Sequence, residues 1–98
     1  MNSAVATRLL IHGRVQGVGY RAWLAGEARR RGLSGWVRNR RAGSVEALLF
    51  AEEAALAELL VACRMGPPTA SVTRIEILEI EPGEADGPFT GFDVRPTI

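Results

Sequence analysis

Three glycines and an arginine in one short stretch near the N-terminus are the residues best suited to chemistry. The stretch covers residues 13–21 and has the sequence GRVQGVGYR. Its glycines, at positions 13, 17 and 19, can take a positive φ, so the backbone can curl and point several N–H groups inward. A helix that begins just after the stretch would add its free N–H groups and the positive end of its dipole. These residue types predict a binding site for an anion, most simply a phosphate.

Arg21 would lie near the first turn of that helix. A cation in this position is unfavourable by about 0.3–1 kcal/mol unless an anion lies close by. No Asp or Glu precedes Glu27, so the sequence offers no local anion, and a bound one is inferred. The spacing is equally compatible with a tight turn in which Arg21 simply lies over the surface. The stretch lacks the Gly-Lys-Ser/Thr ending of a Walker A loop and the third glycine of a dinucleotide fingerprint.

The segments on either side of this stretch indicate how it would be held. Residues 5–12 are apolar enough for a central strand, and residues 20–31 repeat apolar side chains at helical spacing. The apolar stripe of this helix consists of Tyr20, Leu24, Ala25 and Ala28. Gly32 would end the helix. The glycine-rich stretch is therefore expected to be a strand-to-helix loop, where functional residues are common.

The rest of the chain continues with alternating elements. We expect strands at residues 33–40, 44–51 and 70–80, a helix at residues 52–65, and a short final strand at residues 89–95. The second helix has an apolar stripe made of Leu56, Leu59, Leu60 and Cys63. A phase shift after Ile77 suggests a bulge, or burial on both faces, in the strand at residues 70–80. The order is a split βαβ arrangement, which predicts an α+β fold with an antiparallel sheet and two helices on one face.

Asn39 and His12 are polar residues near the ends of expected strands. Asn is depleted in strands and common in turns, so Asn39 could start the turn at residues 41–43. The functional alternative is a carboxamide aimed at a reacting water. His12 is the only histidine and lies beside the glycine-rich stretch. We favour a strand residue that makes a local hydrogen bond over a catalytic role for it.

The acidic residues near the C-terminus form no recognisable metal-binding pattern. Glu79, Glu81, Glu84 and Asp86 have unfocused spacing, and no His or Cys joins them. We therefore expect no metal site.

The stretch GRVQGVGYR resembles the signature loop of the acylphosphatase family. The sequence GWVRN from Gly35, followed by GSVE from Gly43, resembles the second signature of that family. Residues 66–68 and 91–95 also fit, so the similarity runs from about Val5 to Arg95. At one position the chain departs from the pattern, since Ala42 stands where the family usually has Asp or a similar turn-former.

This resemblance implies a ferredoxin-like fold with a short fifth strand, and hydrolysis of small acyl phosphates to carboxylate and inorganic phosphate. The phosphate would be held by a loop that consists of Val15, Gln16, Gly17, Val18, Gly19, Tyr20 and Arg21. Arg21 would bind it through its planar fork, and Asn39 would orient the attacking water. The resemblance also implies that the phosphate of the substrate can accept the proton of that water. It calls for no metal and no cofactor.

Composition is consistent with one small intracellular domain over residues 1–98. Hydrophobic residues make up 47% and charged residues 23% of the chain, which is ordinary for a soluble protein. No apolar run of about 18 residues occurs, and no signal-peptide pattern is present at the N-terminus. Cys63 is the only cysteine, so no internal disulfide can form, and its place on an apolar stripe suggests a buried thiol. We expect a cytoplasmic monomer that needs no membrane.

Two other functions have to be weighed against hydrolysis. Residues 1–45 carry a balance of +8 and residues 46–98 one of −7, so the N-terminal half could bind nucleic acid, although folding can mix the halves. Sheets that bind RNA need exposed aromatic side chains for stacking, and the strands offer mainly Trp36 and Phe50. The run Arg29-Arg30-Arg31 is read as a helix end that matches the dipole rather than as a binding patch. A regulatory domain that binds phosphate without turnover remains the other alternative.

Overall fold

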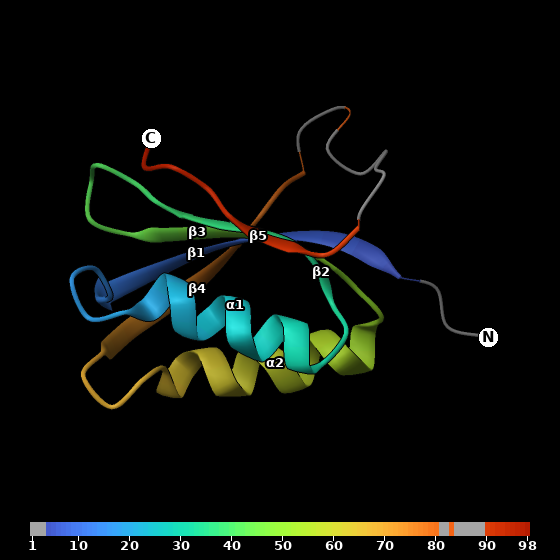
Figure 1. Ribbon diagram of the computed structural model, residues 1–98, viewed down its shortest axis with the longest axis horizontal. Helices are drawn as coiled ribbons and strands as arrows, with labels where there is room; N and C mark the ends of the chain where they lie inside the picture. Colours follow the sequence, from blue (N-terminus) through green and yellow to red (C-terminus); the bar gives the residue numbers. More distant parts are fainter. Residues whose placement is uncertain (1–3, 81–82, 84–89) are drawn as a thin grey trace.

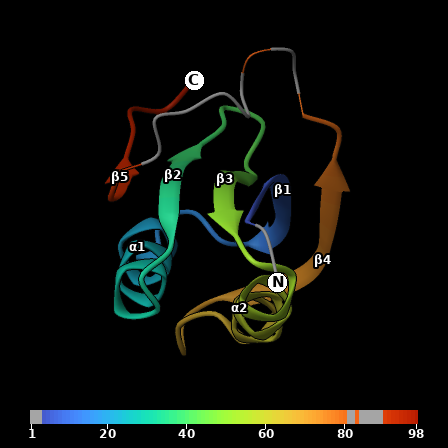
Figure 2. The ribbon, with the colours of Figure 1, turned by 90° about the vertical axis from the view of Figure 1, so that its right-hand side faces the viewer.

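A five-stranded sheet with two helices on one face makes up the chain, in a computed structural model that describes residues 4–80, 83 and 90–98. The strands lie in the order β4-β1-β3-β2-β5. Figures 1 and 2 show α1 and α2 side by side under the sheet, while the described residues place no helix on the opposite face. The elements in chain order are β1 (Val5–Arg14), α1 (Tyr20–Arg30), β2 (Ser34–Asn39), β3 (Val45–Ala51), α2 (Glu53–Met65), β4 (Ser71–Leu78) and β5 (Phe92–Val94).

The architecture confirms the predicted α+β split βαβ fold, but the sheet is mixed rather than antiparallel. The pairs β1–β3, β1–β4 and β2–β3 are antiparallel, whereas β5 runs parallel to β2, with Phe92 beside Gly35 and Val94 beside Val37. The reason lies in the strand order. β5 lies at the edge of the sheet away from β4 and next to β2. Both β2 and β5 run in the direction opposite to β4, so β2 and β5 are parallel to each other. The predicted start of this strand at residue 89 lies outside the described residues.

Apolar side chains from the sheet and the helices meet in one core between the two layers. All four residues of the predicted α1 stripe are buried, and in α2 Leu59 and Cys63 are buried while Leu56 and Leu60 are half-buried. On the sheet, alternation directs one set of side chains toward the helices. The buried members of this set include Leu9, Ile11, Val37, Val45, Ala47 and Leu49. This packing fixes the end of β1 and the start of α1, between which the glycine-rich loop runs.

The irregularity predicted after Ile77 is found elsewhere in the sheet. The β1–β4 register is regular from Arg8–Leu78 to His12–Arg74 and then shifts, so that Gly13 lies opposite Val72. Gly13 has φ +121°, and a Cβ at this position would lie 2.2 Å from the Ser71 carbonyl oxygen. The close approach of the two backbones, rather than apolar patterning, therefore sets the position of the bulge. Neither helix of the described part of the chain is long and apolar enough to cross a membrane.

Candidate active site

The loop between β1 and α1 has the backbone form that its glycines predict. Gly17 and Gly19 have φ values of +74° and +80°, and a Cβ at either position would meet nothing within 4 Å. Glycine is thus needed at these two positions because of the positive φ, and not because a larger side chain would lack space. Gly19 is the N-cap of α1, no side chain caps the helix, and its first turn contains no acidic residue. The free N–H groups at this end can therefore receive an external anion.

A hollow of about 250 Å³ lies beside this helix end. Its lining contains six of the seven predicted loop residues together with Asn39. The lining residues are Val15, Gln16, Gly17, Gly19, Tyr20, Arg21, Ala22, Asn39 and Val94. Val18 is the predicted residue that does not line it, and its carbonyl oxygen instead accepts a hydrogen bond from Thr69 Oγ1 at 2.9 Å.

Arg21 occupies the first turn of α1, as predicted, and is half-buried. It forms no ion pair or side-chain hydrogen bond with residues 4–80, 83 or 90–98. The described residues that line the hollow include no Asp or Glu that could balance its charge. A guanidinium and uncapped helix N–H groups thus face one small space, an arrangement that favours a bound anion.

Asn39 is the last residue of β2 and brings a carboxamide to the same hollow. Its Oδ1 is buried and has no hydrogen-bond partner among the described residues. Such an acceptor costs about 1–3 kcal/mol unless a ligand or a water satisfies it. The turn interpretation of this residue is not supported, because the turn begins one residue later, where the Gly43 N–H donates to the Arg40 carbonyl oxygen at 2.9 Å. Ala42 does not prevent this turn from closing.

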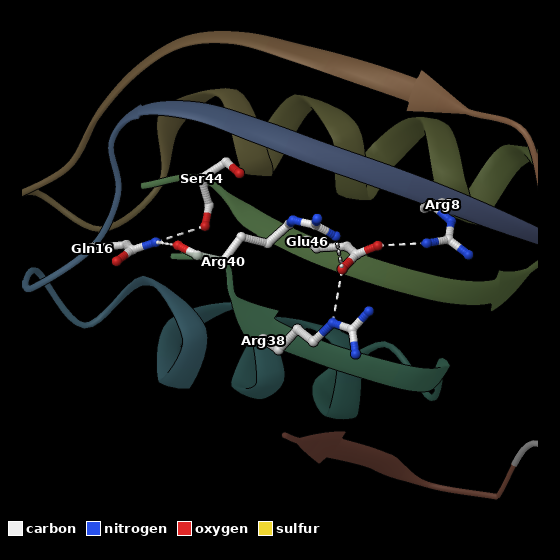
Figure 3. Close-up of polar contacts among 6 residues, drawn as sticks. All are labelled: Arg8, Gln16, Arg38, Arg40, Ser44 and Glu46. Carbon is white, nitrogen blue, oxygen red and sulfur yellow. Dashed lines mark hydrogen bonds and ion pairs between the residues drawn. The ribbon is translucent and has the colours of Figure 1, made fainter. Parts of the chain in front are cut away.

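Several predicted loop residues have structural side chains. The Gln16 Nε2 donates to the carbonyl oxygens of Arg40 at 2.6 Å and Ser44 at 2.8 Å, which ties the loop to the β2–β3 turn (Figure 3). Val15 is in the core. The Tyr20 hydroxyl donates to the Cys63 carbonyl oxygen at 2.7 Å, and burial raises the pKa of this phenol far above its ordinary value. These residues can offer the hollow their backbone groups, while their side chains fix the shape of the loop.

Two residues outside these predictions complete the hollow. Ala22 follows Arg21 on the helix, and Val94 comes from β5. Val94 is 45% exposed and stands beside Val37, two residues before Asn39. No local sequence signal could have placed it there, because its position depends on the parallel pairing of β5 with β2.

His12 has the structural role that we favoured. Its Nε2 lies 2.5 Å from Glu76 Oε1 on β4, and it does not line the hollow. In the described part of the chain, no three His, Cys, Asp or Glu side chains gather in a way that could hold a metal ion. Three of the acidic residues that we considered, Glu81, Glu84 and Asp86, lie outside it.

Glu46, which sequence reasoning singled out only as part of a motif, is a buried carboxylate at the centre of an arginine cluster. It is 1% exposed and accepts hydrogen bonds from Arg8 at 2.5 Å, Arg38 at 2.8 Å and Arg40 at 3.1 Å (Figure 3). Burial alone would raise the pKa of Glu46, but the hydrogen bonds from Arg38, Arg40 and Arg8 and the charge of Arg38 together outweigh it, and the pKa lies below its ordinary value. The carboxylate is therefore ionised in the folded protein near neutral pH.

The helix-free face offers little for nucleic-acid stacking. Trp36 is 6% exposed, and the guanidinium groups of Arg38 and Arg95 both lie over its ring, at 4.6 and 4.8 Å from the ring centroid. At the end of α1, Arg30 and Arg31 pair with Glu27, and Arg29 donates to the Phe92 carbonyl oxygen. Trp36 and the basic run at residues 29–31 are thus engaged in contacts within the protein.

Comparison with known proteins identifies the family. The family model described as acylphosphatase matches residues 7–94. The chain belongs to the acylphosphatase family. The acylphosphatase of Azorhizobium caulinodans is 57% identical over 90 residues, which are 92% of this chain and 94% of the relative.

Solved acylphosphatase structures have the same fold. The crystal structure of acylphosphatase from Bacillus subtilis matches with a TM-score of 0.83 and 37% identity, over 93% of this chain and 98% of that one. The structure of an acylphosphatase from Coxiella burnetii matches with a TM-score of 0.84 and 29% identity, over 95% and 94% of the two chains. The motifs that suggested the family at residues 13–21 and 35–46 thus belong to a true acylphosphatase-family chain.

Proposed function

We propose that this protein hydrolyses the carboxyl–phosphate bond of small acyl phosphates, which yields a carboxylate and inorganic phosphate. The proposal rests on membership of the acylphosphatase family together with the chemistry of the hollow. The observation that carries it is a guanidinium that pairs with no acidic residue of the described part of the chain, beside an uncapped helix N-terminus. The same hollow holds a carboxamide oxygen that has no hydrogen-bond partner among the described residues. These groups match the two needs of the reaction, an anchored phosphoryl group and an oriented water.

Phosphate binding is assigned to the loop and to Arg21. The backbone N–H groups from Val15 to Arg21 would donate to the phosphoryl oxygens, and the Arg21 fork would hold two of these oxygens. Catalysis then consists largely of positioning and charge neutralisation, because an acyl phosphate already has a good leaving group. Val94 supplies an apolar wall beside Asn39, where the acyl part of the substrate would lie.

Water activation is assigned to Asn39. Its buried Oδ1 would accept a hydrogen bond from the water and aim the oxygen of the water at phosphorus. A bond forms between the water oxygen and phosphorus as the bond from phosphorus to the acyl oxygen breaks, and the carboxylate leaves with the bonding electrons. The proton of the water passes to a phosphoryl oxygen, since the described residues that line the hollow include no Asp, Glu or His that could take it. We propose that no metal and no cofactor take part.

Phosphate release from benzoyl or acetyl phosphate tests this function. We expect the wild-type protein to release phosphate in the presence of a chelator, and we expect the folded Arg21→Ala variant to lose at least about 10³-fold in kcat/KM. Full activity of that variant would remove Arg21 from the mechanism. A folded wild-type protein that binds inorganic phosphate but shows no turnover would contradict hydrolysis and favour a regulatory phosphate-binding domain.

A further inference from the structure

The two arginines that flank Asn39 share one buried carboxylate on the opposite face of the sheet. Arg38 Nε and Arg40 Nη1 both donate to Glu46 Oε1, at 2.8 and 3.1 Å. Successive side chains of an extended strand point to opposite faces. The side chains of Arg38 and Arg40, the neighbours of Asn39, are held on the helix-free face (Figure 3). The Asn39 side chain is therefore directed to the helix side, where Asn39 lines the hollow.

The backbone of Asn39 is held by its pairing with Val45 and by the Ile98 N–H, which donates to its carbonyl oxygen at 3.1 Å, so the direction of its side chain is what remains to be fixed. Asn39 is the last residue of β2, and Asn is a residue type that strands disfavour. Its Oδ1 has no partner in the described part of the chain, so no hydrogen bond of that atom holds the side chain in place. Cross-strand pairing sets Arg38 directly opposite Glu46 and Asn39 opposite Val45. Glu46 thus contacts the residues on both sides of Asn39, which is proposed to orient the water.

We propose that Glu46 is a positioning residue, which orients the Asn39 carboxamide by holding Arg38 and Arg40 on the helix-free face. This inference rests on the proposed function and adds a residue that lies outside the hollow. Glu46 does not line the hollow and sits on the other side of the sheet, so it acts only through its neighbours. Its arginine partners remain partly exposed, with side-chain exposures of 20% for Arg38 and 42% for Arg40, whereas Glu46 itself is 1% exposed. The carboxylate is thus the fixed member of the cluster.

The alternative is that Glu46 only stabilises the fold. The two roles differ in how Glu46 couples to Asn39, and a double-mutant cycle measures that coupling. The set of variants is Glu46→Gln, Asn39→Ala, the combination of both, and Glu76→Gln as a matched control. Glu76 is a carboxylate of an edge strand, and its side chain contacts His12 and Arg74 rather than the arginines that flank Asn39. Each variant is measured for kcat, for KM and for inhibition by inorganic phosphate, after circular dichroism has shown that it is folded.

We expect Glu46→Gln to lower kcat by about 10- to 100-fold, because a displacement of about 1 Å in a positioned group can cost up to 100-fold. Inhibition by phosphate should change by less than about twofold, since the loop and Arg21 are untouched. In the Asn39→Ala background the same substitution should lower kcat by less than about twofold. Glu76→Gln should leave kcat unchanged. An equal loss of kcat with and without Asn39 would overturn the proposal, because Glu46 would then act by another route.

Two further measurements keep the test decisive. If Glu46→Gln does not fold, Arg40→Met removes one of the two held side chains at a more exposed position, and its loss of kcat should likewise vanish in the Asn39→Ala background. If the wild-type protein has no turnover at all, the proposed function fails, and NMR still reports on positioning. The signals of the Asn39 side-chain amide should then move in Glu46→Gln and stay in place in Glu76→Gln. Signals that stay in place in both variants would overturn the positioning role.

Discussion

The side-chain amide of Gln16 donates a hydrogen bond to the carbonyl oxygen of Ser44 at 2.8 Å. A second bond from the same nitrogen reaches the Arg40 carbonyl oxygen at 2.6 Å. One side chain of the glycine-rich loop therefore spans both sides of the β2–β3 turn, directly after Asn39. The loop that is proposed to bind phosphate and the strand end that is proposed to orient water are held together by these two bonds.

Replacement of Gln16 by Met should separate these two parts without adding charge. Met has a similar length but no donor, so the Arg40 and Ser44 carbonyl oxygens each lose one hydrogen bond and keep the one that they accept from a backbone N–H. The loss of two hydrogen bonds should lower the unfolding free energy by about 1–3 kcal/mol. KM should rise about tenfold because the loop is no longer held in its binding form. Steady-state kinetics and urea unfolding measure both effects. Arg14→Met serves as a control at an exposed position of the same stretch, and an unchanged KM in Gln16→Met would show that the loop needs no such support.

Arg21→Lys should be nearly as harmful as removal of the side chain. Lys keeps the positive charge but cannot copy the planar fork that holds two oxygens at once. We expect kcat/KM to fall by about 100-fold or more, on the scale of the loss of one donor to a transition-state oxygen. Arg14→Lys makes the same change outside the hollow and should have no effect. A near-normal kcat/KM in Arg21→Lys would argue against two-point binding of the phosphate.

Asn39→Ala should reduce turnover and spare phosphate binding. The substitution removes the buried Oδ1 that is proposed to accept a hydrogen bond from water, while the loop and Arg21 remain. We expect kcat to fall by about 100- to 1,000-fold with little change in inhibition by inorganic phosphate. Phosphate inhibition and single-substrate kinetics separate the two effects. Lost phosphate affinity together with an intact kcat would assign Asn39 to binding instead.

Acid should destabilise the protein in part through Glu46. Its pKa is lowered in the folded state, so its contribution to stability is present above the ordinary value of 4.5 and is lost as the pH falls through the lowered value. The difference in unfolding free energy between wild type and Glu46→Gln should therefore be constant at pH values well above 4.5 and shrink as the pH falls below 4.5. Urea unfolding across this range measures it. A difference that persists at the lowest pH would mean that the lost charge is not what destabilises the variant.

The sequence was most informative about features that depend on residues close to one another in the chain. The stripe at Tyr20, Leu24, Ala25 and Ala28 identified the buried face of α1, and the glycine spacing identified the loop that carries Arg21. Features that depend on pairing between distant segments were missed or misplaced. The direction of β5, the bulge opposite Gly13 and the burial of Glu46 all depend on which strands lie side by side. The periodicity of apolar residues within one segment cannot indicate which distant strand will pair with it.

Cys63 provides a built-in reporter of unfolding. Its side chain has no exposed surface, its carbonyl oxygen accepts the Tyr20 hydroxyl, and burial is the main reason that the pKa of its thiol is raised to about 11. A thiol that is covered and protonated does not react with alkylating reagents. Since the chain has no other cysteine, the rate of labelling measures how often the contact between the start of α1 and the end of α2 opens. The same measurement, repeated with phosphate present, would tell whether a ligand at one end of α1 slows the opening of the whole domain.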